Sequence, residues 1–197
     1  MTAPTQTLDT STEAFHAGED ALQARVGVRE RMAAAGPMLL RDYMPDQHRE
    51  LFEKLPTLLL GALDEAGQPW ATMVAGAPGF VHTPNMHRMQ VKIQPDATDP
   101  VLARVALGSP VGVLGLEPHT RRRNRMNGRV AAFDNKGLAI DVVQSFGNCP
   151  KYIQAREPLA PSQTLPPHPS APQPLGPALD PAALVLLARS DTLFIAS

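Results

Sequence analysis

The chain has 197 residues, of which 43% are hydrophobic and 19% charged, a composition typical of a globular domain with extensions. Its formal net charge of -1 gives no positive field to concentrate nucleic acid or anionic lipid, so neither partner is expected. One cysteine, Cys149, excludes an internal disulfide and suits a reducing compartment. The start has no signal-peptide pattern, and no apolar stretch approaches the roughly 20 residues that span a bilayer. We therefore expect a cytoplasmic protein that does not contact a membrane.

Residues 1–45 predict a helical extension. Thr10 and Glu13 have the spacing of a capping box before an apolar-periodic stretch. That stretch predicts one helix over residues 13–35, and Gly36-Pro37 predicts its end.

Residues 46–156 predict a small β-barrel domain. A short helix over 46–55 is expected to end before Pro56, and the period then changes to that of strands. A turn-rich stretch, 64–69, separates two apolar runs and predicts a β-hairpin. The other expected strands and the one inserted helix are, in chain order, a strand over 89–93, a helix over 99–105 with Pro100 at its first position and Val101, Leu102 and Val105 inward, a strand over 111–116, and a hairpin with arms 126–133 and 138–146. Closure of such a sheet would remove its exposed edges.

The remainder divides into two segments. Residues 157–181 are rich in proline and predict an extended connector without a core. Residues 182–197 repeat a helix-to-strand pattern, with a strand expected at 192–196, and read as the start of a second, incomplete barrel.

Four strings together closely resemble one known family. They are 15–19 (FHAGE), 67–72 (GQPWAT), 121–129 (RRRNRMNGR) and 144–153 (QSFGNCPKYI). They are similar to bacterial proteins of the pyridoxamine 5'-phosphate oxidase family, FMN-binding. The resemblance implies a mainly β fold with flanking helices (α+β), an FMN-binding split β-barrel, and a homodimer with FMN between subunits. Family members include oxidoreductases, flavin reductases and binders of haem or deazaflavin, so fold alone does not fix the chemistry.

The arginines of the third string are the strongest candidate ligands for a cofactor phosphate. Arg121, Arg122, Arg123 and Arg125 lie within five residues, and guanidinium groups bind phosphate through paired hydrogen bonds. Alternation along a strand would place Arg121, Arg123 and Arg125 on one face and Arg122 on the other. The alternative is a solvated edge strand whose charges prevent aggregation.

The second string supplies the candidate contact to the flavin ring. The resemblance implies that the second strand lays its backbone along that ring, which assigns Trp70, Ala71, Thr72, Met73 and Val74 to the cofactor. Trp70 would flank the ring, and the Thr72 hydroxyl would donate a hydrogen bond. For Trp70, packing into the core is an equal alternative.

The fourth string contains Cys149 and Lys151. Gly147 and Pro150 favour a tight turn in which Cys149 is a small buried residue rather than a nucleophile. Lys151 is assigned to a cofactor phosphate or a substrate acid, with simple exposure as its alternative.

Other kinds of site are not expected. The six histidines lack zinc-ligand spacing, and no glycine-rich loop follows a strand as in a dinucleotide-binding unit. We therefore predict an FMN-dependent oxidoreductase acting between a nicotinamide donor, NAD(P)H, and a small molecule, without a named catalytic residue. The alternative is a non-catalytic flavin- or haem-binding or assembly module.

Overall fold

The chain divides into two units, Met1–Arg41 and Asp42–Ser197, in a computed structural model that describes residues 15–147, 149, 151, 153–157 and 175–196. In the described part of the chain, none of the helices is long and apolar enough to cross a membrane.

The first unit contains two helices where one was predicted. Helix α1 (Ala17–Arg25) begins at His16, whose Nδ1 accepts the Gly18 and Glu19 amides while the Glu19 carboxylate accepts the His16 amide. Gly27, at φ +71°, interrupts the chain before α2 (Arg29–Leu39). The predicted end of the helix at Gly36-Pro37 is wrong, because α2 continues to Leu39. Pro37 lies in the last turn, where its missing amide removes little of the helix's hydrogen bonding. The predicted cap at Thr10 and Glu13 lies outside the described residues.

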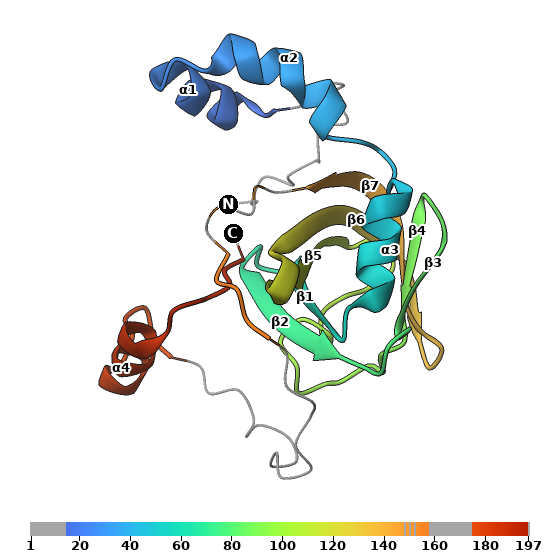
Figure 1. The fold of residues 1–197 in the computed structure, drawn as a ribbon. Coiled ribbons are helices and arrows are strands. Elements are labelled where there is room, and N and C mark those ends of the chain that lie inside the picture. Colours follow the sequence, from blue (N-terminus) through green and yellow to red (C-terminus); the bar gives the residue numbers. More distant parts are fainter. Residues whose placement is uncertain (1–14, 148, 150, 152, 158–174, 197) are drawn as a thin grey trace. The chain divides into compact units, whose positions relative to one another are not determined.

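The second unit is built on a seven-stranded antiparallel sheet (Figure 1). Its strands run in the order β2-β1-β5-β6-β7-β4-β3, so β2 and β3 are the two edges. The strands are β1 (Thr57–Leu63), β2 (Pro69–Ala75), β3 (Val81–Asn85), β4 (Arg88–Val91), β5 (Pro110–Glu117), β6 (Arg122–Asp134) and β7 (Gly137–Gly147). The predicted class, mainly β with flanking helices, is confirmed, as are the two hairpins β1–β2 and β6–β7.

One face of the sheet encloses the hydrophobic core. Along β1 and β5, alternate residues such as Leu58, Leu60 and Val113 are buried, as the period of a half-buried strand requires. Helix α3 (Asp46–Lys54) packs against β3 and β5 and adds Leu51 and Phe52, both fully buried. We call this the inner face and the opposite one the outer face.

Glycine at one position of β5 lets α3 approach the sheet. A Cβ on Gly115 would lie 2.7 Å from both Leu55 Cδ1 and Phe52 Cε1, closer than side chains tolerate. Because Gly115 has no side chain, α3 packs directly against the backbone of β5.

Two predicted elements differ from the structure. The strand expected at 89–93 is the shorter β4. The sequence did not predict β3, because Pro84 and Asn85 favour a loop. An edge strand tolerates proline, since one side of it is unpaired. The helix expected at 99–105 is a series of turns. Asp99 Oδ1 still accepts the Val101 and Leu102 amides, and both of these residues are buried as predicted.

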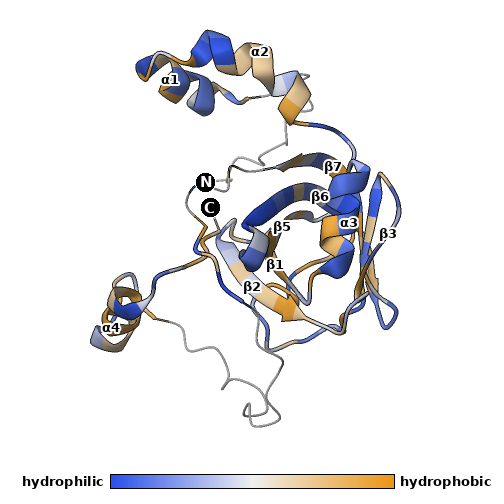
Figure 2. Cartoon of the chain, viewed as in Figure 1, coloured by the Kyte–Doolittle hydropathy of each residue, from blue (hydrophilic) through white to orange (hydrophobic). Residues whose placement is uncertain are grey.

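The C-terminal part contains one helix, α4 (Pro181–Arg189), and then irregular chain. Asp180 caps the helix by accepting the Ala183 amide. Much of α4 is drawn in hydrophobic colours, and its leucines are exposed (Figure 2). Residues 192–196 are not a strand, contrary to the prediction. They make no ladder hydrogen bonds, although the apolar alternation of the sequence resembles that of β1.

Candidate functional site

Two of the four recognised strings are paired side by side in the β6–β7 hairpin. Asn124 and Arg125 of β6 are register partners of Gly147 and Phe146 of β7. Beyond the paired residues, Arg123 Nη2 donates to the Cys149 carbonyl at 3.4 Å. Sequence strings that stand 15 residues or more apart in the chain thus form one surface.

The arginines are divided between two faces and a turn. Arg121 ends the short 3-10 helix η1 (Pro118–Thr120) in the left-handed conformation, at φ 57°, before β6 begins. Arg122 donates to the Gln47 carbonyl of α3 at 3.0 Å. Arg123 and Arg125 point to the outer face, since Asn124 and Met126 between and after them are buried. The predicted set of three therefore reduces to Arg123 and Arg125, because Arg121 precedes the strand alternation.

Among the described residues, the Cys149 carbonyl is the one hydrogen-bond acceptor of the Arg123–Arg125 pair. Arg123 Nε is buried without a hydrogen-bond partner. Partial burial lowers the pKa of Arg125, and the positive charge of Arg123 lowers it further, although guanidinium groups stay protonated at neutral pH. Among the ion pairs of the described residues, none involves either arginine. Two cations this close together favour a bound anion, which would supply acceptors and charge.

A row of residues, most of them glycine or alanine, crosses the outer face of the sheet towards these arginines. Its members are register partners on four adjacent strands: Ala71, Gly61, Gly112 and Asn127. We call them the glycine row. A Cβ on Gly112 would meet nothing closer than Asn127 Oδ1 at 3.6 Å, so packing within the chain does not require glycine there.

The next row along the strands is apolar and ends at one of the arginines. Its register partners are Met73, Leu59, Leu114 and Arg125; we call them the apolar row, and both rows together the outer strip. Met73 is 54% exposed. Strands lie about 4.8 Å apart, so the strip extends about 14 Å from β2 to β6. Figure 2 shows the strongly hydrophilic start of β6 at one end of this arrangement.

The β2 end of the strip offers backbone rather than side chains. Trp70 Nε1 donates to Asp64 Oδ2 at 2.9 Å, and Arg104 Cζ lies 4.9 Å from the Trp70 ring centroid. The Thr72 hydroxyl donates to Asp99. Both side chains are thus engaged within the chain, and Trp70 packs against the core.

Backbone groups on one side of β2 are open to a ligand. Within the described parts of the chain, β1 is the only strand that pairs with β2. An edge strand of this kind presents unpaired amides and carbonyls. Val74 is buried, whereas Ala71 and Met73 face outwards.

The fourth string has one corrected residue. Cys149 is exposed, not buried, because it lies beyond the last paired residue of β7. Lys151 also follows β7 and is exposed.

Sequence reasoning missed a polar cluster on the inner face beneath α3. The Ser145 hydroxyl lies 2.8 Å from His48 Nδ1, and both residues are buried. Asn124 is buried nearby, with its Oδ1 3.6 Å from the position of a Cβ on Gly147. In the sequence, Asn124 and Ser145 are polar residues at inward positions of their strands, but no local pattern shows that His48 of α3 lies beside them.

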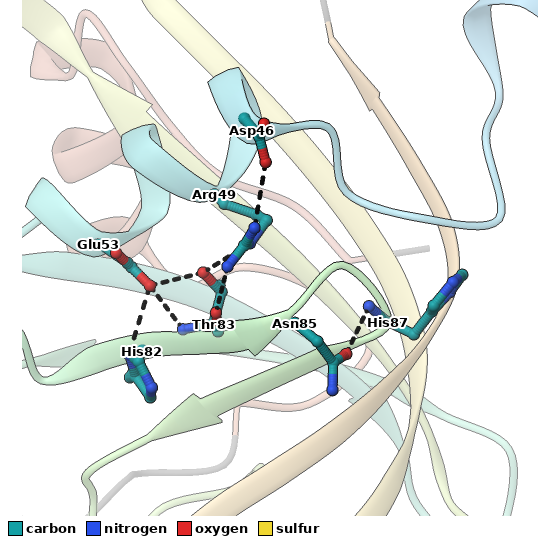
Figure 3. A network of polar contacts seen from close by, with 7 residues as sticks. All are labelled: Asp46, Arg49, Glu53, His82, Thr83, Asn85 and His87. Atoms are coloured by element: carbon teal, nitrogen blue, oxygen red, sulfur yellow. Dashed lines mark hydrogen bonds and ion pairs between the residues drawn. The ribbon is translucent and has the colours of Figure 1, made fainter.

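A second network, shown in Figure 3, fastens α3 to the edge strand β3. The Glu53 carboxylate accepts both the amide (2.7 Å) and the hydroxyl (2.6 Å) of Thr83, and Arg49 donates to the Thr83 carbonyl at 2.8 Å. His82 Nδ1 lies 3.4 Å from the same carboxylate. Thr83 is fully buried. Because these groups satisfy one another, we assign the network to fold stability.

No group of three or more histidine, cysteine or acidic residues in the described ranges could hold a metal ion.

The comparisons with known proteins reach only the level of fold. Neither a family model nor a curated protein sequence matches the chain. A variant of HupZ from Group A Streptococcus has a TM-score of 0.42 at 10% identity, over 53% of this chain and 99% of that chain. An FMN-binding protein from Syntrophomonas wolfei subsp. wolfei has a TM-score of 0.41 at 11% identity, over 67% and 97%. A second HupZ structure has a TM-score of 0.39 at 10% identity, over 53% and 93%. Similarity this distant assigns neither a family nor a ligand.

Proposed function

We propose that this chain is a split-barrel flavoprotein similar to the pyridoxamine 5'-phosphate oxidase family, which binds FMN across the outer strip. The observation that carries the proposal is the pair Arg123 and Arg125, which has no ion-pair partner among the described residues and stands where the strip ends. FMN is an elongated molecule with a planar ring at one end and a phosphate at the other. A flat strip between an open strand edge and a cationic pair matches this shape and charge.

Each part of the strip has a distinct role in this proposal. Arg123 and Arg125 hold the phosphate through charge-assisted hydrogen bonds. The backbone of residues 70–74 hydrogen-bonds the polar edge of the ring, and Lys151 adds positive charge beyond β7. The glycine row lets a planar ring approach the backbone closely, and Leu59 and Leu114 exclude water from one face of the ring.

We propose further that the protein is an oxidoreductase that transfers electrons between NAD(P)H and a small acceptor. Bound FMN supplies the redox chemistry, and the protein supplies position and electrostatics. A cytoplasmic location provides NAD(P)H and keeps the exposed Cys149 reduced.

A non-catalytic flavin binder is the second candidate, because the outer strip carries no proton donor or acceptor of suitable pKa. Arg125 is its one titratable side chain, and arginine does not exchange protons at neutral pH. Hydride acceptance by a flavin needs no side-chain acid, so a strip without a proton donor is compatible with both the oxidoreductase and the binder.

The absorption spectrum of the protein mixed with FMN under anaerobic conditions separates the two candidates. Bleaching of the bound flavin band on addition of NADH or NADPH supports the oxidoreductase. A protein-bound band that neither donor bleaches supports the binder. If no FMN is retained on gel filtration, both flavin functions are refuted.

We also propose that the working form is a homodimer that joins outer faces. Met73 (54% exposed) and Val143 (47% exposed) leave apolar side chains on the sheet surface, and surfaces of this kind usually contact a partner. A two-fold axis would use one such patch twice.

A further inference from the structure

The irregular segment 190–196 touches the glycine row. The Cβ of Ala196 lies 3.7 Å from the position that a Cβ would occupy on Gly61. Gly61 lies between Ala71 and Gly112 in that row. The segment thus covers part of the floor on which the flavin would lie.

The contacts that hold this segment are weak. Arg156, which follows β7, forms an ion pair with Asp191, and each side chain is 57% exposed. Exposed pairs of this kind stabilise little. Leu193 and Ile195 remain 60% and 83% exposed, so the segment gains little from burial of apolar surface.

We propose that residues 190–196 form an autoinhibitory strap, which covers the glycine row at Gly61 and must move away before FMN binds. The inference rests on the proposed function, since it concerns access to the same strip. A covered strip lowers the apparent affinity by the fraction of molecules in which the strap is open. Whatever displaces the strap therefore increases flavin binding without touching the arginines.

A reversible disulfide tests the contact between the strap and the glycine row. In a Cys149→Ser background, Gly61→Cys and Ala196→Cys would place two Cβ atoms 3.7 Å apart, close to the mean separation of about 3.8 Å in a disulfide. The backbone at Gly61 has room for the side chain. We expect the disulfide to form under mild oxidation and to open on reduction. A side chain at Gly61 itself stands on the glycine row, so FMN affinity is measured on variants that leave the strip unaltered.

The outcomes of this experiment separate the strap from the function. Failure of the disulfide to form refutes the contact, whether or not FMN binds. Unchanged FMN affinity in both Arg156→Glu and Asp191→Arg, which would release the strap, refutes the inhibition. If the wild-type chain itself binds no FMN, the proposed function fails and the strap loses its role, while the disulfide yield still reports the contact.

Charge swaps at the ion pair give a second test that leaves the strip unaltered. Arg156→Glu makes the protein more negative and should weaken binding of an anion by general electrostatics, whereas release of the strap should strengthen it. We expect both Arg156→Glu and Asp191→Arg to tighten FMN binding by up to about fivefold. The double variant should return to the wild-type affinity.

Lys136→Glu is the matched control, because it makes the same charge change in the turn between β6 and β7. It should leave FMN affinity unchanged or slightly reduced. Weaker binding by Arg156→Glu together with tighter binding by Asp191→Arg would show general electrostatics instead and overturn the strap.

Discussion

Gly61 of β1 and Gly112 of β5 are register partners on the outer face of the sheet. Neither glycine is required by packing within the chain, because a Cβ at either position would meet only ordinary contacts. Glycine weakens a strand interior. Two adjacent glycines without a structural need therefore suggest that something outside the chain approaches the backbone at this point.

Gly112→Val should abolish FMN binding while the fold survives. Its side chain would stand on the floor of the glycine row, where a flavin ring needs contact with the backbone. Valine also favours strands, so the thermal midpoint should stay near that of the wild type. Circular dichroism and calorimetric titration with FMN measure the two effects. Wild-type FMN affinity in this variant would contradict the position of the ring.

Gly115→Ala is the contrasting control on the same strand. Its Cβ would lie 2.7 Å from side-chain atoms of Leu55 and Phe52, so these side chains, or α3 with them, must shift. Overpacking of this kind costs about 1–3 kcal/mol. Thermal denaturation should show a clear loss of stability for this variant and little for Gly112→Val.

Arg123→Glu should reduce FMN retention far more than it reduces stability. A negative charge beside the cofactor phosphate is repulsive, whereas loss of an exposed arginine interaction costs about 0–1 kcal/mol. We expect at least a tenfold loss of FMN affinity with an almost unchanged free energy of unfolding. Arg88→Glu, which reverses a partly exposed arginine on β4 paired with Asp141, serves as the control and should keep FMN. Wild-type affinity in Arg123→Glu would instead support the alternative that these arginines lie on a solvated strand and bind no phosphate.

The lowered pKa of Glu53 leads us to expect a loss of stability in acid. Burial raises the pKa of this carboxyl, but the hydrogen bonds from Thr83 and the charges of His82 and Arg49 outweigh it, so the pKa lies below its ordinary 4.5. A depressed pKa contributes stability above the unfolded-state value, and this contribution is lost as pH falls through the folded-state value. In urea denaturation from pH 7 to pH 3, the wild type should therefore lose stability below about pH 4.5.

Glu53→Gln isolates this effect. The amide cannot titrate, so the variant should be less stable than the wild type at pH 7, and the difference should shrink in acid. A difference that stays constant over the whole range would show that the Glu53 charge contributes nothing to the attachment of α3 to β3.

Local patterns predicted much of the fold. The apolar runs at 58–63 and 70–75 and the turn between them gave a hairpin with the observed pairing, because alternation and turn chemistry are local signals. The helix of 46–54 was recognised by its apolar face and by Pro56. The strand β3 was missed because Pro84 disfavours most strands but not an edge.

The site was predictable only in part. The sequence predicted Arg121, Arg123 and Arg125 as candidate phosphate ligands on one face, and the strand alternation confirms the shared face for Arg123 and Arg125. The glycine row was not foreseen, since Gly61 and Gly112 become neighbours only through the pairing of β1 with β5, which no local pattern encodes. The conformation of Arg121 and the exposure of Cys149 likewise depend on where β6 begins and β7 ends.

Light scattering of the FMN-bound protein at micromolar concentration tests the proposed assembly. We expect the mass of a dimer, because exposed apolar side chains such as Met73 on the sheet usually contact a partner, and stable interfaces bury about 1,200 Å² or more. Met73→Lys, which places a charge on that face, should shift the mass towards a monomer. A monomeric mass for the wild type with FMN bound would refute the shared face.

Calorimetric titration with FMN and with riboflavin tests the central claim most directly, because the two ligands differ only in the phosphate. Hydrogen bonds to charged groups contribute about 1.5–3 kcal/mol each. We therefore predict that FMN binds at least about tenfold more tightly than riboflavin, and that Arg123→Glu removes this preference. Equal affinity of the wild type for both ligands, or binding of neither, would contradict the assignment of Arg123 and Arg125 to a cofactor phosphate.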